Sequence, residues 1–138
     1  MKTSFLLLAL ALTLAAASPL AARSPKNVVV ENPGSDTPEY AILKTLEAGL
    51  SGDFDGWYEK ICHPDYCLGT SINRDNFTKY SWPRFTKFVE SYFVDKSKRS
   101  FKVDHTDPSE FDDQTASIKF FLFSSKRDNP VPIVIQKD

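Results

Sequence analysis

The spacing of apolar residues changes once along this chain, and the change restricts the fold class. Between Trp82 and Phe93 apolar side chains recur every three or four residues, which is the period of an α-helix. From Phe101 onward apolar and polar residues alternate, which is the period of a strand with one buried face. Helical segments therefore come first and strands second, so we expect an α+β fold with helices packed on an antiparallel sheet.

Two helices are expected before Trp82. Residues 38–51 carry apolar side chains at helical spacing, with Thr37 at the N-cap position and Gly52 where a left-handed C-cap belongs. Asp53 can cap a second, shorter helix. That helix is expected to end at the His63–Pro64 step, because the residue before a proline avoids the helical region.

A stripe of aromatic residues marks a third helix, which starts at Asn73 or Asp75 and restarts at Ser81 with Pro83. This spacing is typical of a core face, and a pocket lining is the alternative. As one core we expect Trp57, Phe85, Phe88, Val89, Phe120 and Leu122. The candidates for a pocket lining are Trp57, Tyr58, Trp82, Tyr92 and His105.

Strands are expected at 101–105, 116–123 and 131–136, joined by an acidic turn and a tight one. If nothing follows the last strand in the fold, one of its edges stays unpaired, and Pro130 and Pro132 block only its beginning. We therefore expect either a homodimer through this sheet or a chain that is a shortened form of a longer protein.

The first 17 residues have the pattern of a secretory signal peptide. One positive charge precedes an uncharged apolar run from Phe5 to Ala17, too short for a stable membrane anchor, and small residues follow. A buried core helix is the alternative. We expect cleavage before Ser18 and a secreted protein, periplasmic if bacterial. Residues 18–37 contain four prolines and are expected to form a flexible tether, with Val28–Val30 as an edge strand.

The chain has two cysteines, Cys62 and Cys67, which enclose His63. In an exported protein a disulfide between them is the leading interpretation. A metal site formed by both cysteines and His63 is an alternative, although a closed zinc site needs four ligands. Free or redox-active thiols are a third. We expect no metal and no cofactor.

Charge argues against a nucleic-acid partner, because 17 basic and 18 acidic residues leave a formal charge of -1. The basic turns at 96–99 and 126–127 have no aromatic platform beside them in the sequence. The acidic residues between Asp104 and Asp113 lack calcium-loop spacing, so a solvated turn is expected and a weak cation site is the alternative. Asn76 fits the rule for a glycosylation acceptor if the host is eukaryotic.

The segment from Leu46 to Tyr58, LEAGLSGDFDGWY, and His63-Pro64-Asp65 are followed by a third helix and strands. This order resembles the nuclear transport factor two-like (SnoaL-like) superfamily over residues 38–138. The resemblance implies a cystatin-like cone, in which the helices pack on a curved sheet, and members usually have one more closing strand. In the ketosteroid isomerase branch a Tyr and an Asp do the chemistry. Ungapped counting puts Thr45 and Gly69 at those places, so that pair is absent.

Two functions remain, because this fold hosts both enzymes and binding domains. The first is a non-catalytic domain that binds a small apolar or amphipathic molecule or self-associates. The second is a small isomerase, cyclase or dehydratase with His105 as acid or base. If Phe101 and Val103 face inward, His105 shares their face and can reach the interior. Asp104 then points away and cannot orient it, and a purely structural histidine is the alternative.

Overall fold

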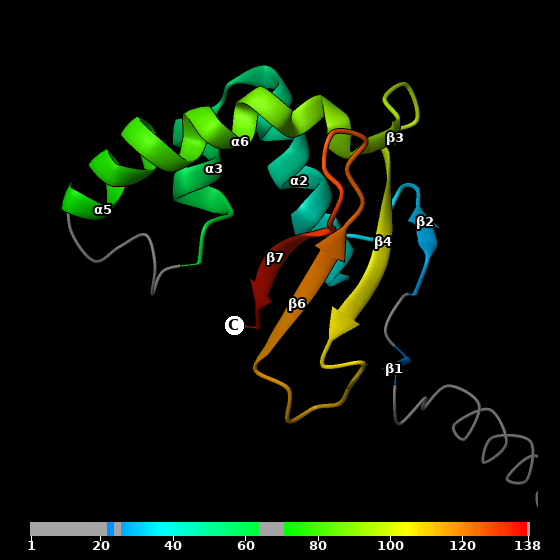
Figure 1. Cartoon of the computed structure of the whole chain (residues 1–138). Helices are drawn as coiled ribbons and strands as arrows, with labels where there is room; N and C mark the ends of the chain where they lie inside the picture. The colour runs from blue at the N-terminus through cyan, green and yellow to red at the C-terminus, as the bar shows by residue number, and fades with distance from the viewer. Residues whose placement is uncertain (1–21, 24–25, 64–70, 138) are drawn as a thin grey trace, which may run out of the picture.

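The computed structural model describes residues 22–23, 26–63 and 71–137 and shows an α+β fold, with helices on one side of an open antiparallel sheet (Figure 1). The helical elements are α2 (Pro38–Ser51), α3 (Phe54–Lys60), α5 (Ser71–Asn76), the π-helical η1 (Phe77–Ser81), α6 (Trp82–Phe88) and the 3-10 helix η2 (Val89–Tyr92). The main sheet contains β2 (Val28–Val30), β3 (Phe93–Asp95), β4 (Ser100–Asp107), β6 (Ser117–Leu122) and β7 (Val131–Gln136). A separate two-stranded sheet pairs β1 (Ala22–Arg23) with β5 (Glu110–Phe111).

The main sheet has the order β2-β4-β6-β7, and β3 pairs with the start of β4. All pairings in it are antiparallel. The expected edge strand at Val28–Val30 is confirmed, since it pairs with residues 101–103 of β4. At the opposite side β7 pairs with β6, and no other strand among the described residues pairs with β7.

Helix α2 has the bounds that the sequence predicted, and it ends where Gly52 adopts a left-handed φ of 74°. Thr37 precedes it, but its hydroxyl donates to the carbonyl of Gly34 instead of accepting from a helix N–H. Asp53 does cap α3, because its carboxylate accepts from the backbone N–H of Gly56 at 3.0 Å. The two helices therefore form the expected hairpin, but α3 ends at Lys60, before the His63–Pro64 step where the sequence predicted its end.

The third helix is interrupted just before Trp82, where the sequence predicted a restart at Ser81 with Pro83. Pro83 has no N–H to offer the carbonyl four residues earlier, and the helix widens there, so that the N–H of Trp82 donates to the carbonyl of Phe77. The other end tightens into η2, and Phe93, expected in the helix, begins the short strand β3. Strand β3 was missed because three residues are too few to show a period.

The core lies between α2, η2 and the inner face of the sheet. Its fully buried side chains, each 0% exposed, are Ile42, Leu46, Phe101, Val103, Phe120 and Leu122. Of the predicted core, Val89, Phe120 and Leu122 are confirmed, and Phe85 and Phe88 pack against it while partly exposed. Trp57 is not a member, since its neighbours are other aromatic rings of the helical arm.

Gly49 allows α2 and α6 to approach each other closely. A Cβ at this position would lie 2.6 Å from Cε1 of Phe85 and 2.9 Å from Cγ2 of Val89. Such distances are shorter than carbon atoms tolerate, so only a glycine permits this helix contact. The contact holds the aromatic face of α6 against the core.

Candidate functional site

A cavity of about 510 Å³ lies where the start of α2 meets the lower ends of β6 and β7. We call it the sheet-end pocket. Its lining comes from four separate segments of the chain: Ser35–Ala41, Phe111–Asp113, Thr115–Ile118 and Ile135–Lys137. Because these segments are up to about a hundred residues apart, no local motif in the sequence could reveal the pocket.

The inner wall of the sheet-end pocket is apolar. Ile118 of β6 and Ile135 of β7 are direct cross-strand partners, and both pack against the hydrophobic core. Both are only half-buried, so part of each side chain faces the cavity. Ala41 of α2 lines the same cavity. An apolar group that enters here would cover surface that the fold leaves uncovered.

The rim of the sheet-end pocket is polar and mainly acidic. It carries Asp36, Asp112 and Asp113, with Lys137 as the basic residue in the lining. The Asp112 carboxylate accepts from the N–H of Gln114 at 2.9 Å and from the Thr115 hydroxyl at 3.2 Å. These bonds hold the turn after β5 in place. The sequence alone predicts only a solvated turn or a weak cation site for this acidic run.

A second, more open cavity of about 630 Å³ lies between the α2–α3 hairpin and the β3–β4 turn. Four of the charged groups in its lining are already paired: Lys44 Nζ lies 3.0 Å from Glu47, and Lys96 Nζ lies 2.8 Å from Glu90. The hydrogen bond to Glu47 raises the pKa of Lys44, and the hydrogen bond from Lys96 lowers the pKa of Glu90. A ligand would have to compete with these pairs, so this groove is the weaker candidate.

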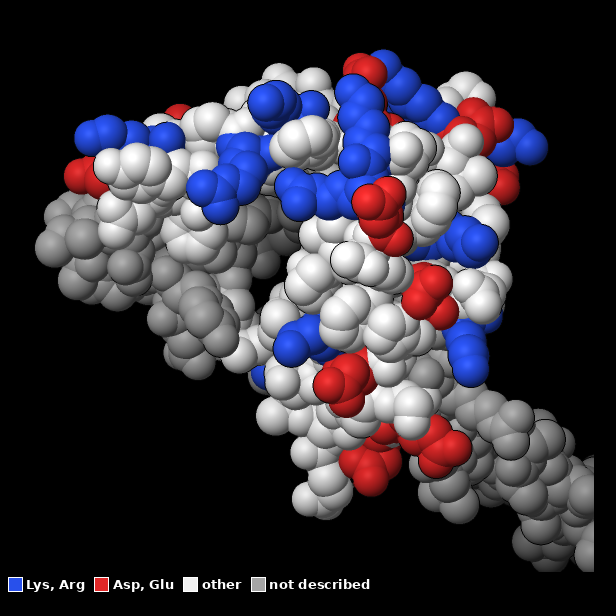
Figure 2. Space-filling model, viewed as in Figure 1, with Lys and Arg blue, Asp and Glu red and all other residues white. Residues whose placement is uncertain are grey.

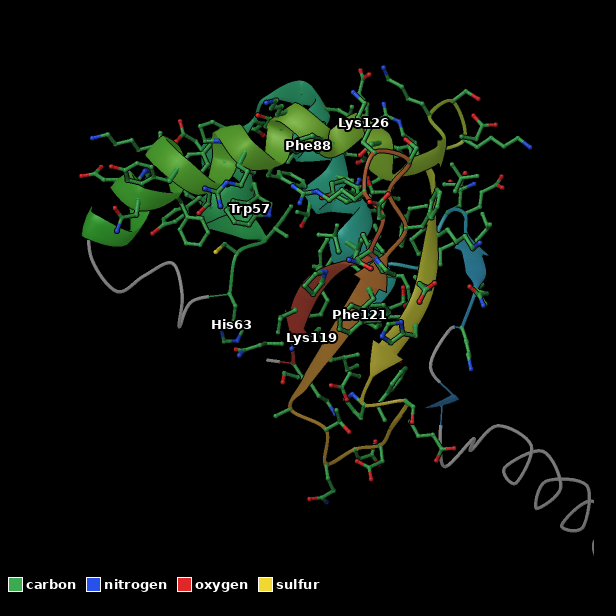
Figure 3. The ribbon with its side chains drawn as sticks, viewed as in Figure 1. Trp57, His63, Phe88, Lys119, Phe121 and Lys126 are labelled. Atoms are coloured by element: carbon green, nitrogen blue, oxygen red, sulfur yellow. The ribbon has the colours of Figure 1, made fainter. Side chains whose placement is uncertain are left out.

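His105 lies outside both cavities, and its predicted place in the interior is wrong. Its imidazole stacks on Phe121, with the ring centroids 4.1 Å apart, and its side chain is 46% exposed. Figure 3 shows Phe121 on the face of the sheet turned to the viewer, whereas α2 runs behind. A register shift in β4 between Val103 and His105 explains this, because a bulge reverses the side to which later residues point.

The same bulge brings His105 and Asp104 together, although strict alternation would separate them. Nδ1 of His105 lies 2.7 Å from Oδ2 of Asp104. The pair lies in the lining of neither cavity described above. An imidazole beside a carboxylate can serve acid–base chemistry, but neither of these cavities brings a substrate to it.

The aromatic pocket candidates form a cluster of their own in the helical arm. Trp57, Tyr58 and Trp82 contact Phe54 and Phe77, with ring centroids 5.3 to 6.2 Å apart. The indole N–H of Trp57 donates to the Thr45 hydroxyl at 3.1 Å, which joins α3 to α2. Tyr92 is buried in the core, Trp57 lines the second, more open cavity, and none of the four lines the sheet-end pocket.

Several predicted features fall partly outside the described residues. Cys67 and residues 1–17 lie there, so the disulfide with Cys62 and the signal peptide stay predictions. Asn76 is exposed at the end of α5. Within the described ranges, no group of three or more His, Cys, Asp or Glu residues is placed to hold a metal, and no helix has the length and apolar character to cross a membrane.

Comparison of this chain with known proteins found no match. No protein-family model matches the chain, and no match was found among curated proteins or solved structures.

Proposed function

We propose that this protein is an exported, non-catalytic binding domain of the SnoaL-like kind that takes a small amphipathic molecule into the sheet-end pocket. One observation carries the proposal: a single cavity of about 510 Å³ combines an apolar wall with a polar rim. Cavities of this size, with few polar groups around an apolar interior, are the usual form of small-molecule sites. The helical hairpin packed on an antiparallel sheet supports the SnoaL-like assignment, and the apolar N-terminal run supports export.

The rim favours a cationic or hydrogen-donating head group. Three carboxylates, those of Asp36, Asp112 and Asp113, face one ammonium group, that of Lys137, around the opening. An anionic head group would meet net repulsion there, whereas an ammonium group would be attracted. The apolar tail would then lie against Ile118 and Ile135. A compact amine with one aliphatic chain fits both parts of the pocket.

Titration calorimetry with decyltrimethylammonium and decanoate, which share a chain length and differ in head-group charge, tests this proposal. We expect tighter binding of the cation, and a loss of at least about tenfold in Ile118→Trp, whose indole would fill the cavity. Val134→Trp is the matched control, because Val134 is 50% exposed on the other side of the sheet. Ile135→Trp serves as a second filling variant if Ile118→Trp does not fold. Equal binding of both probes, or undiminished binding by both filling variants, would overturn the proposal.

Self-association is a second candidate function, favoured by the edge of β7. Among the described residues that edge has no strand partner, and its row of backbone groups can pair with β7 of a second copy. Light scattering should then show a dimer that Val134→Lys weakens, since edge charges oppose such pairing. A stable monomer at high protein concentration would exclude it.

An enzymatic role for His105 has less support. The imidazole is paired with Asp104 on the outer face of the sheet and lines neither cavity. Acid–base catalysis requires the substrate within hydrogen-bond reach of the catalytic group, and the sheet-end pocket does not provide this.

A further inference from the structure

Basic side chains gather on the surface formed by α6 and the turn between β6 and β7. The cluster consists of Arg84 and Lys87 on α6 and Lys126 and Arg127 in the turn, with Phe88 between them; we call it the basic patch. Figure 2 shows Lys and Arg side chains over this part of the molecule, and Figure 3 shows Phe88 and Lys126 beside each other in the same view. Asp and Glu side chains lie over the sheet and at its lower end, and others lie at the top of the molecule beside basic ones.

The ring of Phe88 joins the two halves of the basic patch. Lys87 Nζ lies 5.5 Å and Arg127 Cζ 4.8 Å from the ring centroid, both within cation–π range. Arg84 is one helical turn before Phe88 and therefore shares its side of α6. The sequence shows no aromatic platform beside residues 126–127, because the ring comes from a different element.

Buried hydrogen bonds hold the turn against the helix. The hydroxyls of Ser91 and Ser124 lie 2.7 Å apart, and the N–H of Ser125 donates to the Ser91 carbonyl at 3.0 Å. Ser91 also donates to the Phe88 carbonyl at 2.6 Å. Both serines are at most 5% exposed. The cations are therefore presented from a rigid base rather than from a loose loop.

The four cations are not neutralised within the described part of the chain. None of them forms an ion pair there, whereas Lys44, Arg74 and Lys96 each have a carboxylate partner. The pKa of the Glu90 carboxyl is lowered mainly by its hydrogen bond from Lys96, and Lys126 contributes less. A protein of net charge -1 thus keeps a local excess of positive charge on one surface.

We propose that the basic patch docks this protein onto a bilayer rich in anionic phospholipid. The residues of the patch line neither cavity, so the partner must offer an array of negative charges outside a pocket. Cations already lie over the aromatic rings of this surface: Lys87 and Arg127 over Phe88, and Lys79 at 5.6 Å over Tyr80. The occupied rings are therefore poorly suited to stack on bases or sugars. Tyr80, 57% exposed on the same helical run, suits the lipid headgroup region.

Co-sedimentation of the full chain with phosphatidylglycerol–phosphatidylcholine vesicles tests the proposal. Each cation at an anionic surface strengthens binding by about fivefold. Replacing all four with Gln should therefore weaken binding by about two to three orders of magnitude. The matched control replaces Lys26, Lys60, Lys98 and Lys119 with Gln, has the same net charge, and should lose far less. All variants retain the N-terminal apolar run, so its contribution cancels.

A double variant, Arg84→Gln with Lys126→Gln, leaves the cations over Phe88 intact and keeps the test valid if the fourfold variant does not fold. Binding should fall with added salt and be lost on pure phosphatidylcholine. Equal binding by the patch variants and the control would overturn the proposal. So would a wild-type protein that ignores the vesicles and binds a DNA oligonucleotide or heparin instead.

Discussion

The two apolar regions of this molecule differ in how completely they are closed. Around α2 and the sheet, aliphatic and phenyl side chains reach 0% exposure. In the arm formed by α3, η1 and α6, large rings contact one another, yet Tyr58 of α3 is the buried residue there and η1 and α6 contain none. The difference teaches that apolar content alone does not make a core. A pleated sheet and a helix provide two broad surfaces that exclude water, whereas short helices among themselves leave ring edges exposed.

The largest expected effect distinguishes the two regions directly. Phe120→Ala removes a ring that is 0% exposed and should lower the free energy of unfolding by about 3 to 5 kcal/mol. Phe77→Ala removes a half-exposed ring of the arm and should cost about 1 to 2 kcal/mol. Urea unfolding followed by circular dichroism measures both. Equal losses would show that the arm is as well packed as the core.

A second prediction concerns the joint between the regions. Gly49→Ala forces a methyl group into the contact of α2 with Phe85 and Val89 and should destabilise the protein by about 1 to 3 kcal/mol. Ser51→Ala, at an exposed position of the same helix, should change stability by less than about 0.5 kcal/mol. If both variants unfold at the same urea concentration, the close helix approach is not needed.

Trp57 provides a third and smaller test, because its indole N–H connects the arm to α2. Trp57→Phe keeps a ring but loses the hydrogen bond to Thr45, which should cost about 1 kcal/mol. Thr45→Val, which replaces the acceptor, gives the second arm of a double-mutant cycle. Strictly additive effects in the double variant would mean that the bond contributes nothing.

The smallest effect is the pH dependence of Tyr92, which lies where the core meets α6. Burial raises the pKa of its hydroxyl, and the nearby Arg127 opposes this. The folded protein therefore holds this proton more tightly than the unfolded chain. Its contribution to stability is complete below the unfolded pKa of about 10 and is lost as pH rises through the folded value. The difference in alkaline absorbance titration between wild type and Tyr92→Phe should show one tyrosine that ionises at a higher pH than a tyrosine of the unfolded chain. Arg127→Gln should raise the pH of this ionisation further. An ionisation at or below the unfolded value would contradict the prediction.

Local patterns were enough for the order and type of the long elements. Helix α2 and its end at Gly52 follow from apolar spacing and one residue that tolerates positive φ, both properties of neighbours in the chain. The inner faces of β6 and β7 follow from alternation in the same way. The α+β class was predicted correctly for this reason.

Tertiary structure decided the sites. The bulge in β4 turned His105 outward and placed it beside Asp104, and alternation along a strand contains no sign of such a shift. The sheet-end pocket and the basic patch each join segments that lie far apart in the chain, as Phe88 and Arg127 do. Sequence periodicity records which side of an element avoids water, because that depends on each residue and its near neighbours. Which surfaces then meet depends on how all the elements pack, and this is known only once the chain has folded.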